Sequence, residues 1–256
     1  FNAQYQTVKQ FVSEKIGTME KTITTEPAYF GPSAFIDLIH SIQLELTGAD
    51  VSFSAPLSFN AKIKQGDILI SDMFNLYKYE NLLYTMRLSG KEIKGFLEES
   101  YAGWTNQMKS ADDHLLLIKK RKEGNGYMFV NPSFNFDSAA GIIYTVDVSK
   151  PKGEKITIIR MANGKPFEMD KQYKVAVNSY RGNGGGELLT KGAGIPIDQL
   201  SSRIISSTEK DLRYYLIQYV KSKGTISPKS MDQWKMIPEE WVKKGAEKDS
   251  KLLFGN

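Results

Sequence analysis

The chain has 256 residues, of which 41% are hydrophobic and 25% charged, enough apolar material for one large domain or two small ones. It contains no cysteine, which excludes disulfides, thiolate catalysis and thiolate metal sites, and no apolar run approaches the ~18 residues of a membrane span. The net charge of +5 comes from 34 basic and 29 acidic residues mixed along the chain, so charge alone does not indicate a nucleic-acid partner.

The N-terminal residues predict a helix that leads in from a longer precursor. Between residues 4 and 16, apolar side chains recur at helical spacing, namely Val8, Phe11, Val12 and Ile16. The first five residues are polar, lack an initiating methionine and do not form a signal peptide. We therefore expect that a preceding part of the protein is missing. Residues 19–29 show no periodicity and are expected to form a linker or an edge strand.

A second helix is predicted from Ser33 to Gly48. Its apolar face contains Phe35, Leu38, Ile39 and Ile42. His40 lies beside this face, and because no second histidine or cysteine is near, we expect a packed core histidine. A strand at residues 50–54 and a loop to residue 64 follow.

The next elements are predicted from capping signals and alternation. Ser71 is expected to cap a short helix over residues 72–76, and a strand follows at residues 82–88. Ser89 and Glu92 form a capping-box pattern. The helix that they begin has its core face at Ile93, Phe96, Leu97, Tyr101 and Trp104.

Residues 119–161 are expected to be β-structure. Alternating apolar residues predict strands at 142–148 and 155–161. The basic run Lys119–Lys122 is interpreted as a solvated hairpin tip. Asp112, Asp113 and His114 are the one local cluster with metal-ligand chemistry, but adjacent positions converge poorly on one ion, so a solvated turn is favoured.

A strand at residues 173–177 leads into the glycine-rich stretch Asn178–Leu189. Three consecutive glycines lose much backbone entropy on folding, so they are expected where the chain needs positive φ or a close approach. Tyr180, Arg181 and Asn183 precede them. An aromatic face, a cation and bare amides could hold a flat, partly anionic ligand, but the spacing alone favours an ordinary loop with a core tyrosine.

The C-terminal part is predicted to be a helix and a tail. Thr208 is expected to open the helix and Gly224 to close it. Two tryptophans, Trp234 and Trp241, are expected to pin the tail to the body.

Three stretches, read together, resemble a known family in order and spacing. Residues 66–81, 88–98 and 173–187 are similar to the C-terminal substrate-binding domain of the 5′-nucleotidase and 2′,3′-cyclic-nucleotide phosphodiesterase family, and Ala140–Asp147 adds to the likeness. The resemblance covers roughly residues 27–220. It implies an α+β fold of mixed β-sheets packed with helices. Its expected parts are a lead-in at 1–26, a nucleotide-binding domain at 27–224 and a packed tail at 225–256.

The resemblance also implies a site. In the family the nucleobase lies between two aromatic rings, which correspond by motif position to Tyr79 and Tyr180, and the motif asparagine is Asn81. Stacking is worth ~1–3 kcal/mol per base and tolerates different bases. The other expected site residues are Asn60, Arg181, Asn183, Gly184, Gly185 and Gly186.

The sequence departs from the family where relatives contact ribose and phosphate. Gly186, followed by Glu187, stands where many relatives have an acidic ribose-binding residue. Residues 58–60 replace a motif whose arginine meets the substrate, so that arginine is absent. We hypothesise that Arg181 supplies part of the missing charge.

The family's catalysis uses a two-metal centre in an N-terminal metallophosphoesterase domain. This chain has only His40 and His114 and lacks the corresponding motifs, so we assign it no catalytic or metal-binding residue. The two divalent ions and that domain are expected in the missing part of the polypeptide. The expected ligand is a nucleotide or nucleoside, and the resemblance implies a periplasmic or exported protein.

Two other interpretations remain open. The departures at Asn60 and Gly186 would suit a non-catalytic binding or scaffolding module whose pocket is retuned or lost. An RNA-binding domain would use Tyr79, Tyr180 and the Lys119–Lys122 run, although the mixed charge argues against it. RNA binding would collapse between low and moderate salt, whereas base clamping would barely change.

Overall fold

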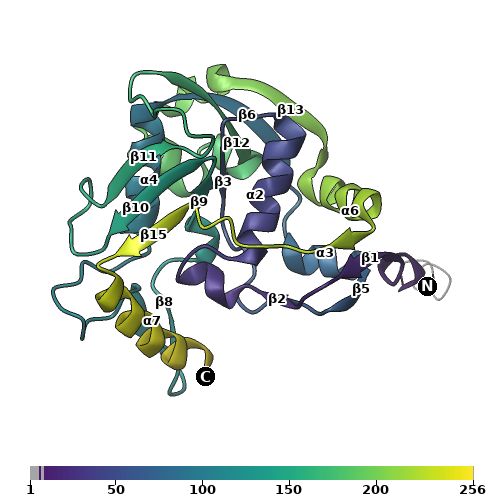
Figure 1. Cartoon of the computed structure of the whole chain (residues 1–256), viewed down its shortest axis with the longest axis horizontal. Coiled ribbons are helices and arrows are strands. Elements are labelled where there is room, and N and C mark those ends of the chain that lie inside the picture. The colour runs from purple at the N-terminus through teal and green to yellow at the C-terminus, as the bar shows by residue number, and fades with distance from the viewer. Residues whose placement is uncertain (1–5, 7–8, 256) are drawn as a thin grey trace.

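The computed structural model describes residue 6 and residues 9–255. The strands are β1 Lys15–Met19, β2 Ile23–Thr24, β3 Val51–Ser54, β4 Lys62–Ile63, β5 Gly66–Leu69, β6 Leu82–Ser89, β7 Ile118–Lys120, β8 Tyr127–Phe129, β9 Ser138–Ala140, β10 Ile142–Asp147, β11 Ile156–Met161, β12 Gln172–Asn178, β13 Ile204–Asp211, β14 Thr225–Ile226 and β15 Trp234–Ile237. The helices are α2 Ala34–Thr47, α3 Ile70–Leu76, α4 Gly90–Ala102, α5 Ser179–Gly182, α6 Leu212–Lys223 and α7 Glu239–Phe254. The α+β prediction is confirmed (Figure 1).

The largest sheet has the strand order β13-β6-β12-β3-β9 within the described residues. β12 pairs antiparallel with β6 and parallel with β3, so Val175 lies beside both Met86 and Val51. Side chains alternate across the sheet, which places Phe53 against α4 and Ser52 against α2. The two helices therefore cover opposite faces of this sheet.

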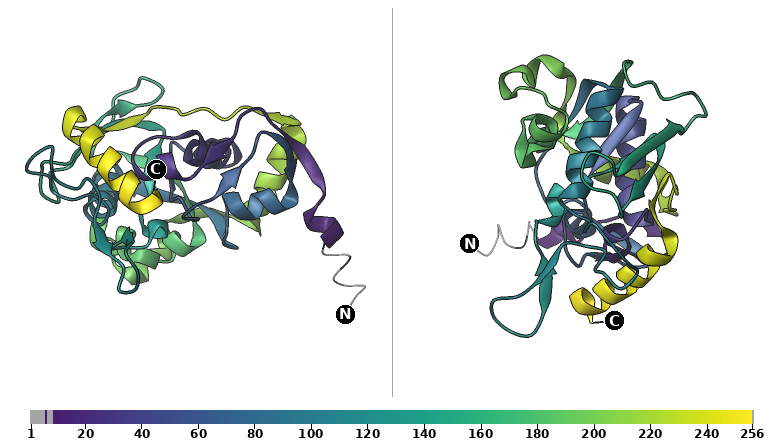
Figure 2. Two further views of the ribbon diagram at one scale, coloured as in Figure 1. Left: turned by 90° about the horizontal axis from the view of Figure 1, so that it is seen from below. Right: turned by 90° about the vertical axis from the view of Figure 1, so that its left-hand side faces the viewer.

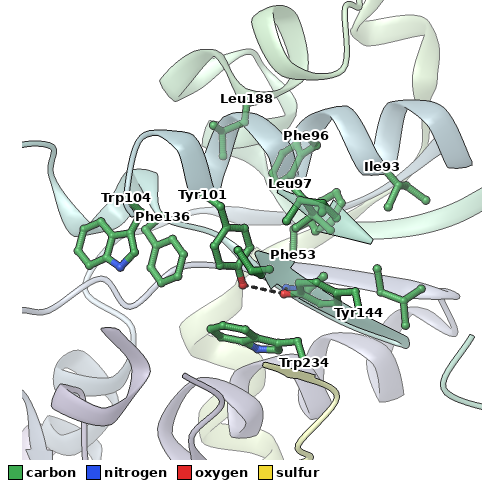
Figure 3. Packing of buried hydrophobic residues seen from close by; sticks show 14 of the residues in the cluster. Phe53, Ile93, Phe96, Leu97, Tyr101, Trp104, Phe136, Tyr144, Leu188 and Trp234 are labelled. Carbon is green, nitrogen blue, oxygen red and sulfur yellow. Dashed lines mark hydrogen bonds between the residues drawn. The ribbon is translucent and has the colours of Figure 1, made fainter. Parts of the chain in front are cut away.

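The α4 face contains the larger apolar core. The capping box is confirmed, because the Ser89 amide donates to Glu92 Oε2 at 2.7 Å and the Glu92 amide donates to Ser89 Oγ at 3.2 Å. Phe96 of α4 stacks on Phe53 with ring centroids 3.9 Å apart, and Tyr101 is completely buried. Figure 3 shows these side chains converging between the helix and the strands.

The C-terminal segment completes this core, as the tryptophans predicted. Trp234 is 4% exposed and stacks on Tyr144 at 5.9 Å between centroids. The Tyr144 hydroxyl lies 2.8 Å from that of Tyr101 (Figure 3). β15 pairs parallel with β10, so the tail is part of a sheet rather than an appended strap. Trp241 packs against the same core from α7.

His40 is a core histidine, as predicted. It is fully buried, with Nδ1 at 2.9 Å from Ser52 Oγ and Nε2 at 3.1 Å from Ser138 Oγ. Burial lowers the pKa of the imidazole from its usual 6.5 to about 3, since a buried cation would lose its hydration. The folded protein therefore holds this ring neutral.

We expect His40 to make folding sensitive to acid. In the unfolded chain its pKa is near 6.5, so unfolded chains bind the additional proton once the pH falls below that value. The unfolding free energy that the neutral His40 ring contributes is fully present above pH ~6.5. It falls by about 1.4 kcal/mol per pH unit as the pH decreases toward ~3. Urea denaturation measures the unfolding free energies of wild type and His40→Gln. The difference between them should decrease at this rate from pH 6.5 to pH 4.5.

The comparison with the variant is needed because Asp37 opposes this trend. Burial raises the pKa of its carboxyl from 3.8 to about 6, so Asp37 contributes stability below pH ~3.8 that is lost as the pH rises through about 6. Both proteins contain Asp37, so its contribution cancels in the difference. A difference independent of pH would contradict the assignment to His40.

Two helix starts differ from the sequence prediction. Thr208 does not open a helix, because residues 204–211 form the edge strand β13, in which Thr208 Oγ1 accepts from the Leu83 amide at 2.9 Å. α6 begins at Leu212 and is capped by the Asp211 side chain, and Gly224 ends it at positive φ as predicted. α3 begins at Ile70, and the Asp72 carboxylate accepts from the Leu69 amide at 2.8 Å.

The N-terminal segment differs in part from the expected helix, whereas the edge strand that was one alternative for residues 19–29 is present as β2, which pairs within the described residues with β4 alone. Residues 6 and 9–12 are helical, whereas Val8 lies outside the described residues. Ile16 belongs to β1 rather than to the helix, and β1 pairs with β5 and with β14. Ile16, Met19 and Ile23 are buried in the core on the α2 face. Residues 15–26 are thus part of the folded body.

The basic run lies at a hairpin, as predicted. β7 and β8 pair antiparallel, and the loop between them contains Arg121 and Lys122. Figure 2 shows the hairpin extending from the body on the side where α7 lies. In the described residues, no helix has the length and apolar character needed to cross a membrane.

Candidate functional site

A pocket of about 220 Å³ opens at the end of β12. Six residues from four parts of the chain form its wall, namely Leu57, Tyr79, Asn81, Phe134, Asn178 and Tyr180. Asn178 is the last residue of β12 and caps the short helix α5, where Tyr180 lies. The structure therefore brings together Tyr79, Asn81 and Tyr180, which are far apart in the sequence.

Three aromatic rings determine the shape of the pocket. Phe134 is next to both tyrosines, with its ring centroid 6.1 Å from that of Tyr79 and 6.4 Å from that of Tyr180. The planes are steeply inclined, at 81° and 84° respectively. Tyr79 and Tyr180 are 38% and 44% exposed. Both tyrosines therefore present ring surface to solvent, next to a phenylalanine.

The pocket also has a neutral polar edge. Asn81 Nδ2 donates to the Tyr77 hydroxyl at 3.3 Å, and burial raises the pKa of Tyr77 to about 12, so this hydroxyl stays protonated. The Asn178 side-chain oxygen accepts from the Arg181 amide at 2.8 Å. No carboxylate lines the pocket within the described part of the chain. The arrangement suits a flat, polar-edged ligand.

Arg181, which was expected to supply part of the missing charge, does not line this pocket. It is 1% exposed, and Nη2 donates to Asp137 Oδ1 at 2.7 Å and to the Phe134 carbonyl at 2.8 Å. Nη1 donates to the Gly185 carbonyl at 2.5 Å. The guanidinium carbon lies 5.4 Å from the Tyr180 ring centroid. Arg181 therefore holds the segments that carry Phe134 and Tyr180.

The glycines support the Tyr180 ring and do not line the pocket. Gly184 and Gly186 have φ of +94° and +68°, as the sequence predicted. A Cβ atom at Gly185 would lie 2.5 Å from the Tyr180 ring, so this position needs glycine for close packing. Asn183 is exposed and, like Asn60, is absent from the pocket wall.

Phe134 is the pocket residue that sequence analysis missed. It lies in a short 3₁₀ turn, Ser133–Asn135. The surrounding proline, serine and asparagine residues are typical of a loop. An aromatic residue within such a polar loop was the available signal. Leu57 and Asn178 were also not assigned to the site, although Asn178 begins the glycine-rich stretch.

In the Asp112–His114 cluster, the side chains of Asp113 and His114 bond to different partners. The Asp113 carboxylate accepts from the amides of Lys109 and Ser110 at 2.6 and 3.0 Å, which lower its pKa. His114 Nδ1 lies 2.5 Å from Oδ1 of the buried Asp249 on α7. Residues 6 and 9–255 contain no group of three or more His, Cys, Asp or Glu side chains arranged to hold a metal ion.

A family model described as the 5′-nucleotidase, C-terminal domain, matches residues 15–191. The chain belongs to this family. The match begins at β1 and therefore covers residues 15–26 of the expected lead-in. It also contains both tyrosines of the pocket.

Relatives of this 5′-nucleotidase C-terminal domain are much longer proteins. The trifunctional nucleotide phosphoesterase protein YfkN of Bacillus subtilis is 30% identical over 194 residues, which cover 71% of this chain and 12% of the relative. A 2′,3′-cyclic-nucleotide 2′-phosphodiesterase/3′-nucleotidase of Salmonella typhimurium is 29% identical over 195 residues, covering 72% and 28% respectively. The chain therefore spans a minor part of the curated relatives that it matches.

Solved structures show the same fold. A putative 5′-nucleotidase from Staphylococcus aureus, solved in complex with alpha-ketoglutarate, aligns with a TM-score of 0.70 at 20% identity, over 92% of this chain and 43% of that one. A 5′-nucleotidase precursor from Thermus thermophilus aligns with a TM-score of 0.70 at 19% identity, over 93% and 42%. The 5′-nucleotidase C-terminal domain again corresponds to less than half of each longer chain.

Proposed function

We propose that this chain is the nucleotide-recognition domain of a nucleotide phosphohydrolase. Tyr79 and Tyr180 hold the nucleobase between their rings, with Phe134 beneath it and Asn81 at its edge. The observation that carries the proposal is the pocket itself, because Tyr79, Asn81 and Tyr180, identified from two separate motifs, line one aromatic hollow. Base–aromatic stacking contributes ~1–3 kcal/mol per base and accepts any base.

Hydrolysis belongs, in this proposal, to a dimetal metallophosphoesterase domain that precedes the chain in the same polypeptide. The small share of each relative that the chain covers, 12% and 28%, supports this arrangement. The names of those relatives, a nucleotide phosphoesterase and a cyclic-nucleotide phosphodiesterase, support a nucleotide substrate. We propose export to the periplasm or cell surface for the whole protein.

The experiment is a calorimetric titration of adenosine, AMP and 2′,3′-cyclic AMP into wild type and Tyr180→Ala. We expect saturable binding in wild type and a loss of at least about tenfold in affinity in the variant, since one stacking surface is removed. Tyr214→Ala is the matched control, because Tyr214 is similarly exposed at 43% but lies on α6 and does not line the pocket.

The outcomes separate the proposal from its rivals. Equal affinity of Tyr180→Ala and wild type would contradict the base clamp. No binding of any of the three ligands at millimolar concentration would favour a scaffolding module. Binding of single-stranded RNA that disappears at moderate salt would instead indicate the nucleic-acid interpretation.

A further inference from the structure

A groove of about 530 Å³ continues the aromatic pocket toward the β7–β8 hairpin. The groove and the pocket share three residues, Leu57, Tyr79 and Phe134. The pocket alone, at about 220 Å³, is smaller than the roughly 300–1,000 Å³ of typical small-molecule sites. With the groove included, the hollow falls within that range, so a ligand larger than one nucleoside fits it.

The charged residues in the groove wall are cations. Lys78 and Arg121 line it, and no Asp or Glu does so among the described residues. Lys78 Nζ lies 5.9 Å from the Tyr79 ring centroid, next to the expected base position. Arg121 uses Nε to donate to the Tyr127 carbonyl at 3.2 Å. Neither side chain forms an ion pair with a described residue, so both charges are available to an anion.

The rest of the groove offers apolar surface. Phe59, Met128 and Val130 are 37%, 41% and 42% exposed, and all three line it. Phe59 is held by stacking on Phe254 of α7, with centroids 4.9 Å apart. Methionine adapts to flat aromatic partners through its polarizable sulfur. This combination of two cations, Lys78 and Arg121, with an apolar wall in the same groove suits a phosphate next to a second aromatic group.

We propose that the groove is a second subsite, which takes the linking phosphate and the second nucleoside of a dinucleotide. The proposal rests on the base clamp at Tyr79 and Tyr180, where the first base lies. Lys78 and Arg121 meet the phosphate, and the second base lies against Met128 and Val130.

The test compares adenosine, AMP and adenylyl-(3′→5′)-adenosine by calorimetry. We expect wild type to bind the dinucleotide at least about tenfold more tightly than AMP, because a second stacked base is added.

Met128→Glu should reduce dinucleotide affinity about tenfold and leave adenosine affinity unchanged. Met169→Glu is the matched control, since Met169 is similarly exposed at 38% but lines a different hollow beside α4.

A double variant examines the phosphate contact. Lys78→Met with Arg121→Met should lower the affinity for the dinucleotide and flatten its dependence on salt, because two charge contacts are lost. Adenosine binding should persist in this variant.

Each contrary result identifies what fails. If wild type binds adenosine but binds the dinucleotide no more tightly than AMP, the second subsite is overturned and the base clamp stands. Tighter dinucleotide binding that Met128→Glu leaves unchanged would place the second nucleoside elsewhere and would also overturn the proposal. Absence of adenosine binding would refute the base clamp, and the subsite with it.

Discussion

Arg181→Met should destabilise the protein by about 3–5 kcal/mol, the usual result of breaking a buried ion pair. Arg181 and Asp137 are each 1% exposed, with Nη2 and Oδ1 2.7 Å apart, so the variant leaves a carboxylate buried without its counter-charge. The same change releases the Phe134 and Gly185 carbonyls from the guanidinium. Urea denaturation at pH 7 measures the loss, and adenosine affinity should fall with it.

The cause can be distinguished from a general packing defect. Adding Asp137→Asn to Arg181→Met removes the unpaired charge, so the double variant should recover part of the lost stability. Lys191→Met breaks an exposed pair with Glu187 and should leave the denaturation midpoint unchanged. A double variant less stable than Arg181→Met would contradict the ion-pair explanation.

Glu98→Ala should cost about 2–4 kcal/mol of unfolding free energy. The carboxylate is 5% exposed, and it accepts from the amides of Gly153 and Ile156 at 2.8 Å each and from that of Lys155 at 3.2 Å. Removing it leaves several amides without an acceptor, each a cost of about 1–3 kcal/mol where water does not replace the bond.

Lys155 adds to this effect. Burial lowers the pKa of its ammonium group, and Glu98 opposes that shift, so the variant also removes the nearest compensating charge. Hydrogen exchange should accelerate at the amides of Lys155 and Ile156. Glu98→Gln keeps one acceptor oxygen and should lie between wild type and Glu98→Ala. Equal stability of all three proteins would contradict this account.

Local signals in the sequence predicted local structure well. Ser89 and Glu92 lie three residues apart, so their mutual capping could be recognised directly, and the alternation at residues 142–148 predicted β10. The pocket tyrosines required the family motifs, because Tyr79 and Tyr180 become neighbours through the sheet. The helix start predicted at Thr208 was wrong. A threonine before acidic residues is typical of a helix start, but this segment pairs with β6 and forms a strand.

The errors at the site come from long-range contacts. Arg181 looked available for phosphate, but its partner Asp137 lies 44 positions earlier, and the sequence does not show that they meet. The same guanidinium donates to the Phe134 carbonyl at 2.8 Å, a contact that the sequence does not show either. The glycines, too, were expected to touch ligand. At Gly185, the absence of a side chain lets the Tyr180 ring pack closely against the backbone.

The position of the last strands has a consequence for how the protein is made. β1 pairs with β14 and β10 pairs with β15, so two sheets receive a strand from residues beyond 224. During synthesis, Met19 and Tyr144 lack these strand partners until the final segment of the chain has left the ribosome. A chain truncated at residue 224 would retain the whole aromatic pocket, yet it would expose unpaired strand edges to aggregation. Protein prepared for binding studies therefore needs the C-terminal segment for solubility, even though the nucleobase is not expected to touch it.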